Sequence, residues 1–253
     1  MIHVKTASEL RRMRVPCALT GELRAYVAGL VRPGVSTKEL DDAAAAWIAE
    51  RGVKSAFLGY NGYPAHICVS INDVVVHGIP SAHEIVQDGD IVSIDFGIVA
   101  DGFVGDCATT VPAGEVAPRT RELCRVTRAS LVAGIAAAKD GGHLTDIGHA
   151  VQTVAEAAGF GVVRDYCGHG IGRKMHEDPS ILNYGRPGHG PVLKSGMVLA
   201  IEPMITQGTY KVEVMDDGWT VRTRDRLPAA HYENTVVVTP SGGEILTVPD
   251  IAG

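Results

Sequence analysis

Two aspartates lie on neighbouring segments that alternate apolar with small residues, and their spacing suits the binding of one shared cation. Asp95 falls on the non-apolar face of residues 91–98, and Asp106 falls on the same kind of face in residues 103–111. A four-residue loop between the segments would set the two carboxylates opposite each other, whereas a two-residue loop at 101–102 would make them diagonal neighbours. Two like charges this close need a proton or a cation between them. A solvated strand face is the alternative interpretation.

Two glutamates and one histidine extend this pattern. Glu202 ends the apolar segment 198–201, and Glu233 opens another apolar strand. An acid at the end of a buried strand is costly unless it is paired or binds a metal, so a structural ion pair is the alternative. His169 lies between glycines in CGHGIG, where close backbone approach is allowed. Four carboxylates and one imidazole form a hard ligand set that suits two divalent ions about 3.5–4 Å apart.

Two more histidines flank this set in the sequence. His77 lies in VVVHGIP, and His176 lies in MHEDP. We expect each to act as a hydrogen-bond donor beside the metal ligands or to face a substrate. The remaining seven histidines have no comparable sequence context, so no role is assigned to them.

Composition excludes several classes of protein. The 253 residues carry a net charge of −6, which argues against a nucleic-acid-binding protein. No apolar run is long enough to span a membrane, and the charged N-terminus does not resemble a signal peptide. The five cysteines are widely spaced without a C-x-x-C pair, which indicates packed thiols in a reduced, cytoplasmic protein.

These residues must be positioned by helices and strands that the patterns predict. The predicted helices cover residues 8–31 (with a kink at Pro16), 36–51, 118–139 and 145–158. The predicted strands cover residues 67–71, 74–76, 91–98, 103–111, 197–201, 211–215, 220–224 and 231–239. The two helix pairs form a weak internal repeat, for which chance similarity between helical hairpins is the alternative. We therefore expect one α+β domain over 1–253, in which two helix pairs cover a curved, mainly antiparallel sheet, with halves at roughly 1–115 and 116–253.

The chain resembles the methionine aminopeptidases of the type I form. Seven segments occur in that family's order and spacing: VVVHGIP, IDFG, the downstream GD, CGHGIG, MHEDP, IEPM and HYENT. The resemblance implies the pita-bread (creatinase/aminopeptidase-like) fold with a pseudo-twofold axis. It also implies a cytoplasmic metalloenzyme, expected to be a monomer, that removes the initiator methionine from the N-terminal peptides of nascent chains.

By motif match, the resemblance also assigns roles. The implied ligands of two divalent ions (Mn, Fe(II), Co or Zn) are Asp95, Asp106, His169, Glu202 and Glu233, of which Asp106 and Glu233 bridge the ions. Glu202 is expected to shuttle a proton, and His77 and His176 to contact the substrate. The implied methionine pocket is lined by Tyr60, Tyr63, Cys68, Met175 and Trp219.

Three residues depart from the family pattern. Met175 stands where Phe is common, Phe57 where a smaller residue is common, and Asn234 where His usually follows the bridging glutamate. The first two touch the pocket wall, so they bear on side-chain preference, whereas the third leaves the ligand set intact.

Three alternatives are carried forward. An Xaa-Pro aminopeptidase or prolidase shares the ligand pattern but usually has an extra N-terminal domain. A non-catalytic relative could use the same fold to bind partners, although such proteins typically lose ligands. Arg222, Arg224 and Arg226 alternate along one strand, which favours a solvated edge strand over a contact with the ribosome.

Overall fold

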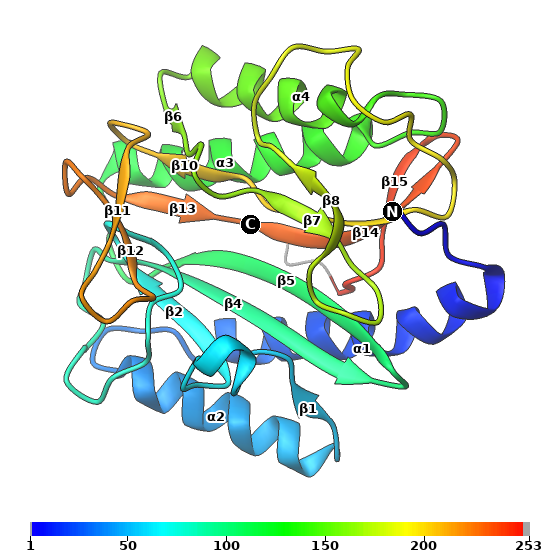
Figure 1. The fold of residues 1–253 in the computed structure, drawn as a ribbon. Helices are drawn as coiled ribbons and strands as arrows, with labels where there is room; N and C mark the ends of the chain where they lie inside the picture. Colours follow the sequence, from blue (N-terminus) through cyan, green and yellow to red (C-terminus); the bar gives the residue numbers. More distant parts are fainter. Residues whose placement is uncertain (1, 250–253) are drawn as a thin grey trace.

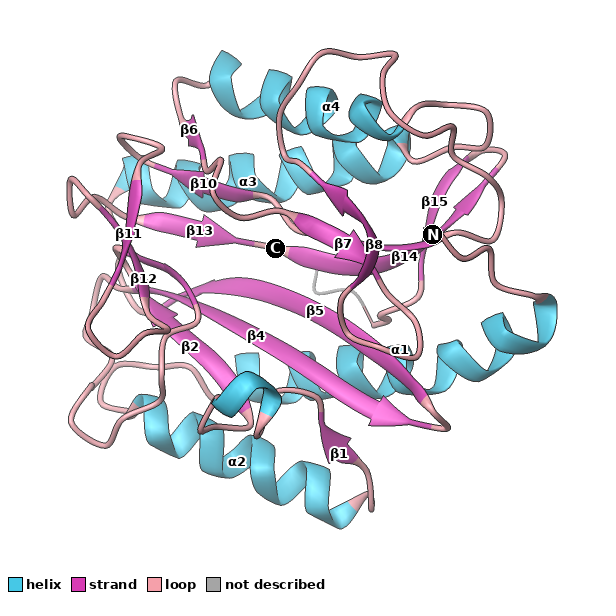
Figure 2. Ribbon diagram, viewed as in Figure 1, coloured by secondary structure: helices cyan, strands magenta, loops and turns pink. Residues whose placement is uncertain are grey.

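Two pairs of helices enclose a curved sheet (Figure 1). The computed structural model describes residues 2–249. The first pair, α1 and α2, lies on one side of the strands, and α3 and α4 lie on the other (Figure 2). The helices are α1 (Ala7–Ala28), α2 (Thr37–Glu50), α3 (Pro118–Ala137) and α4 (Leu144–Ala157), with one short 3₁₀ turn, η1 (Tyr60–Gly62). All four predicted helices are present.

Local sequence signals set where the helices begin. Ser36 accepts a hydrogen bond from the backbone N–H of Glu39, whose carboxylate returns one to the N–H of Ser36, so the predicted capping box is present. Thr6 and Glu9 make the same exchange at the start of α1. Pro118 is the first residue of α3, where its missing N–H costs nothing.

The main sheet has nine strands, and every pairing in it is antiparallel. The order along it is β1-β4-β5-β14-β9-β7-β8, while β2 pairs with β4 and β15 pairs with β14. Its strands are β1 (Lys54–Ser55), β2 (Ile67–Ile71), β4 (Ile91–Ala100), β5 (Phe103–Pro112), β7 (Gly168–Gly170), β8 (Glu177–Ile181), β9 (Val198–Ile201), β14 (Glu233–Thr239) and β15 (Gly242–Ile245). The prediction of a curved, mainly antiparallel α+β fold is confirmed.

Two smaller sheets of three strands flank the main one. The first has the order β13-β10-β6 and the second the order β11-β12-β3. Their strands are β3 (Val74–Val76), β6 (Gly161–Val162), β10 (Met204–Thr206), β11 (Val212–Val214), β12 (Val221–Thr223) and β13 (Ala229–His231). The predicted strand 231–239 is therefore two strands, which part at Tyr232 and join different sheets.

The turn between β4 and β5 decides how the two aspartates face each other. Ala100 pairs with Phe103, so the loop has two residues, and Gly97 rather than Asp95 lies opposite Asp106. Both loop residues have positive φ, the conformation that a tight hairpin of this kind requires. The diagonal arrangement is the correct one of the two predicted registers.

Strand β12 corrects one prediction. It lies between β11 and β3, so it is not an edge strand. Arg222 forms a two-pronged ion pair with Asp73 at 2.9 and 3.0 Å, and Arg226 binds Glu213 at 2.8 Å. These arginines therefore serve the packing of this small sheet. Within residues 2–249, no helix combines the length and the apolarity needed to cross a membrane, and all five cysteines are free thiols.

Candidate active site

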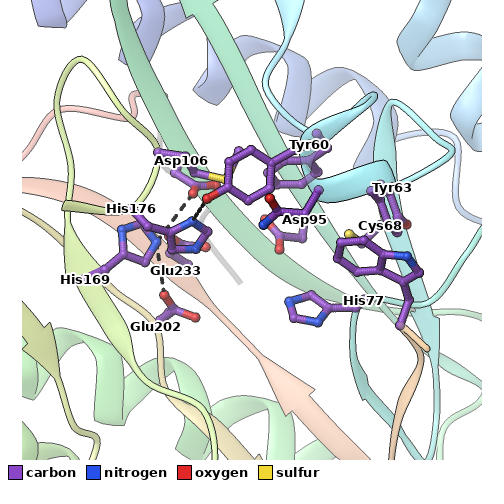
Figure 3. A pocket seen from close by; sticks show the side chains of 14 residues that line it. Tyr60, Tyr63, Cys68, His77, Asp95, Asp106, His169, His176, Glu202 and Glu233 are labelled. Carbon is purple, nitrogen blue, oxygen red and sulfur yellow. Dashed lines mark hydrogen bonds and ion pairs between the residues drawn. The ribbon is translucent and has the colours of Figure 1, made fainter. Parts of the chain in front are cut away.

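All twelve predicted site residues line a single cavity of about 250 Å³ (Figure 3). They come from both halves of the chain and from elements far apart in sequence. Phe57 and Asn61 complete the lining. The full set is Phe57, Tyr60, Asn61, Tyr63, Cys68, His77, Asp95, Asp106, His169, Met175, His176, Glu202, Trp219 and Glu233. One end of the cavity is acidic, and the other is aromatic and apolar.

Three buried side chains at the acidic end gather their ligand atoms within 4.8 Å of one another: Asp106, His169 and Glu233. The Nε2 of His169 lies 3.8 Å from Oδ2 of Asp106 and 3.5 Å from Oε1 of Glu202. Its Nδ1 lies 3.0 Å from the carbonyl oxygen of Gly170. A proton on Nδ1 would satisfy that carbonyl and leave the Nε2 lone pair for a metal, which is the usual arrangement of a histidine ligand.

Two glycines allow His169 to reach this position. A Cβ atom on Gly168 would lie 2.3 Å from the carbonyl oxygen of Ala200, and one on Gly170 would lie 2.0 Å from that of Asp178. Strand β7 is therefore packed so closely between β9 and β8 that only glycine fits on either side of the histidine. The sequence pattern CGHGIG has this physical origin.

The surroundings of the four carboxyl groups favour their neutral, protonated forms. Burial raises the pKa of Asp95 to about 7, and burial together with the neighbouring acids raises the pKa values of Asp106, Glu202 and Glu233 well above the ordinary range. Buried oxygens of Asp95, Asp106 and Glu233 have no hydrogen-bond partner. A bound cation would satisfy these oxygens and favour the charged carboxylates, so the donor set fits a hard divalent metal.

His231 is a site residue that the sequence analysis missed. Its Nε2 is buried without a hydrogen-bond partner, 3.9 Å from Oε2 of Glu202 and 4.0 Å from Oε2 of Glu233. Burial lowers its pKa to about 3. The expectation that the seven other histidines lack a comparable context is wrong for this one. Its place two residues before Glu233 was the available signal, because alternate residues of an extended chain share a face.

Aromatic rings form the opposite wall of the cavity. Tyr63 and Trp219 meet edge to face with ring centroids 5.1 Å apart. The hydroxyl of Tyr63 donates to the carbonyl oxygen of Gly78 at 2.9 Å, which fixes the ring against the backbone. Met175 and Phe57 also line the cavity, so two of the three departures from the family pattern bear on its shape.

The third departure, Asn234, turns away from the cavity. Its Oδ1 accepts hydrogen bonds from Arg24 at 2.8 Å and from the hydroxyl of Thr247 at 2.7 Å. Arg24 also donates to the carbonyl oxygen of Glu233. Asn234 therefore ties helix α1 to the strand that carries Glu233.

The two histidines that were predicted to contact the substrate line the cavity on opposite sides (Figure 3). His77 follows β3 with φ of 61°, and a Cβ on the next residue, Gly78, would lie 2.1 Å from the carbonyl oxygen of Val69. Burial lowers the pKa of His77 to about 4 and also lowers that of His176. Both imidazoles are therefore neutral at pH 7.

Comparison with known proteins gives concordant results. The model of metallopeptidase family M24 matches residues 11–240. The methionine aminopeptidase of Clostridium acetobutylicum is 48% identical over 98% of this chain and 99% of its own length. Methionine aminopeptidase 1 of Mycobacterium tuberculosis is 49% identical over 98% of this chain and 96% of its own length.

Solved structures agree with the sequence matches. The crystal structure of methionine aminopeptidase from Thermotoga maritima superposes with a TM-score of 0.96 at 44% identity, over 98% of this chain and 99% of that one. The prolidase of Pyrococcus furiosus superposes with a TM-score of 0.77 at 22% identity, and only 66% of its chain is covered. The second likeness is one of fold alone.

Proposed function

Because the chain belongs to metallopeptidase family M24, among its methionine aminopeptidases, we propose that it removes the N-terminal methionine from peptides by metal-dependent hydrolysis. The observation that carries this proposal is the cavity itself. Unpaired buried carboxylates and a histidine meet at one end, and an apolar aromatic wall of suitable size for an unbranched side chain stands at the other. Such a wall can contact a thioether favourably.

The ligand set is a proposal of its own. We assign Asp95, Asp106, His169, Glu202 and Glu233 as the side chains that would hold two divalent ions. Mn, Fe(II), Co and Zn all accept these donors, and their availability decides which is bound. When bound, the ions supply Lewis acidity that lets water attack a peptide carbonyl near pH 7.

The surrounding side chains then handle protons and charge. Glu202 takes a proton from the attacking water and delivers it to the leaving amine, a role open to a carboxyl group that lines the cavity beside His169. His176 donates to the carbonyl oxygen as negative charge develops on it. His77 donates to or orients the scissile amide. The methionine side chain packs among Tyr60, Tyr63, Cys68, Met175 and Trp219.

The substitution Glu202→Gln tests the proton shuttle. It keeps the size of the side chain but removes its ability to exchange a proton, so we expect methionine release to fall by about 10²-fold or more. Metal content is measured in the same samples, because a drop in bound metal would make the variant uninformative about the shuttle. Activity within tenfold of the unsubstituted protein, at unchanged metal content, would exclude this role.

Substrate class is tested with matched peptides. Metal-stripped protein titrated with Mn(II) or Co(II) should release methionine from a Met-Gly-Met peptide and leave the N-acetylated peptide intact. Faster cleavage of an Ala-Pro peptide than of a Met-Ala peptide would instead support the Xaa-Pro alternative. Absence of hydrolysis with metal bound would support the non-catalytic alternative.

We also propose the cellular setting that the resemblance implies. The substrates are the N-termini of nascent chains in the cytoplasm, and the protein acts as a monomer with one catalytic domain built from two similar halves. A ribosome contact through Arg222 and Arg226 is not favoured, because both side chains already have acidic partners.

A further inference from the structure

The hydroxyl of Tyr60 lies 2.7 Å from Nδ1 of His176, a contact drawn in Figure 3. The two rings are 5.4 Å apart between centroids and tilted by 36°. Tyr60 is the first residue of the 3₁₀ turn η1, and the preceding Gly59 as well as Asn61 and Gly62 within the turn have positive φ. This tight turn projects the phenol toward a histidine 116 positions later in the chain.

The contact links the hydroxyl of Tyr60 to the tautomer of His176. A neutral imidazole has one N–H, and its other nitrogen is an acceptor. A phenol can donate its O–H and can also accept through its oxygen. The basic imidazole nitrogen is a better acceptor than the phenol oxygen, so the O–H donates to Nδ1. In that arrangement the single proton of the ring lies on Nε2.

His176 lines the cavity, and its ring centroid lies 4.3 Å from that of His169. With Nδ1 occupied by Tyr60, Nε2 is the nitrogen left for a substrate. A protonated Nε2 can donate to a carbonyl oxygen that gains negative charge, whereas a bare Nε2 would present a lone pair to it and oppose the reaction.

We propose that Tyr60 is a positioning residue that fixes His176 as the Nε2–H tautomer, so that the histidine faces the substrate as a hydrogen-bond donor. This rests on the proposed function, since it explains how His176 can serve the reaction assigned to it. It also links recognition to chemistry, because the ring of Tyr60 forms part of the wall against which the substrate side chain packs.

Tyr63 provides a matched control. It is the second tyrosine of the same wall, but its hydroxyl donates to the carbonyl oxygens of Gly78 and Ile67 instead of to a histidine. Tyr63→Phe therefore removes a phenol from the cavity without touching His176. Tyr60 itself is 36% exposed, so Tyr60→Phe should fold normally.

The test is the tautomer of His176, read from long-range ¹H–¹⁵N correlation spectra of ¹⁵N-histidine-labelled protein at pH 8. The His176 signals are assigned by their loss in His176→Gln. We expect the Nε2–H pattern in the unsubstituted protein and in Tyr63→Phe, and a mixed or Nδ1–H pattern in Tyr60→Phe. An Nδ1–H pattern in the unsubstituted protein, or an unchanged pattern in Tyr60→Phe, would overturn the proposal.

Kinetics of a Met-Ala peptide give the second readout. Loss of the tautomer preference in Tyr60→Phe should lower kcat by about 10- to 100-fold, with KM within about threefold, because the donor acts mainly in the transition state. The spectra can be recorded without turnover. A shifted tautomer in a protein that releases no methionine would therefore support the positioning role of Tyr60 while refuting the proposed function.

Discussion

At the scale of single residues, the site concentrates groups that are unfavourable in a folded interior. Asp106 and Glu233 are nearly inaccessible, and each has a buried oxygen without a hydrogen-bond partner. His169 is the only nitrogen donor in the cluster of three that the described residues form. Residue type and spacing were enough to predict these groups, because hard ligands beside glycines and at strand ends are unusual. His231 was not predicted, although its place two residues before Glu233 was a usable signal.

His169→Ala tests the ligand assignment at this scale. Removal of the only imidazole from the cluster should lower bound metal by at least one ion per chain and reduce methionine release by about 10²-fold. Metal content by mass spectrometry, alongside the peptide assay, measures both.

His189 offers a matched control for this variant. It also lies between two glycines, Gly188 and Gly190, but it is exposed and is not among the residues that line the cavity. His189→Ala should retain metal and activity. Full metal content in His169→Ala would show that the imidazole is not a ligand.

At the scale of elements, the prediction is accurate where the interactions that form a helix or strand lie within its own sequence. The four helices were predicted to within a few residues, because caps and spacing lie within the helix itself. Several short strands escaped prediction: β1, β6, β7, β8, β10 and β15. Two or three residues of unremarkable sequence, as in β6 and β7, become strands only beside distant partners such as β10 and β9. The division of residues 231–239 into β13 and β14 has the same origin.

Gly168→Ala tests whether close strand packing positions the histidine. The added methyl group would collide with the carbonyl oxygen of Ala200, so β7 must move away from β9. We expect a loss of about 1–3 kcal/mol in the free energy of unfolding, together with weaker metal binding, measured by urea denaturation and by metal titration.

Gly29→Ala is the comparison for this variant. Gly29 has a negative φ and is exposed, and a Cβ atom there would make only ordinary contacts at 3.4 Å or more. The free energy of unfolding should change by about 0.5 kcal/mol or less in Gly29→Ala. Equal effects of the two substitutions would mean that β7 is not tightly held.

At the scale of the whole molecule, the acidic cluster makes stability depend on pH and metal. The raised pKa values mean that the folded, metal-free protein retains protons that the unfolded chain releases. The stability that these four carboxyl groups give the folded, metal-free protein is therefore lost as pH rises. Three histidines have lowered pKa values and make the folded protein more stable as pH rises: His77, His169 and His231. This effect is confined to pH below about 6.5, where histidines of the unfolded chain become charged.

Metal-free protein should consequently become less stable between pH 6.5 and 8. Each carboxyl that keeps its proton only when folded contributes about 1.4 kcal/mol per pH unit. Urea denaturation in the presence of a chelator measures how the free energy of unfolding changes with pH. Saturating Mn(II) should raise this free energy and make it less dependent on pH, because the metal replaces the protons. A stability that is flat or rising with pH in the chelator would contradict the raised pKa values.

Strand β14 has a consequence for the order in which the protein is made. It lies between β5 and β9, pairing Asn234 with Cys107 on one side and with Ile201 on the other. Ribosomes synthesise the chain from its N-terminus, so Asp95 and Asp106 emerge long before Glu233, and the sheet lacks its middle strand until then. Such distant pairings form slowly. A chain stalled before residue 233 should therefore bind divalent metal more weakly than the finished protein, and metal binding becomes one of the last events in the protein's own maturation.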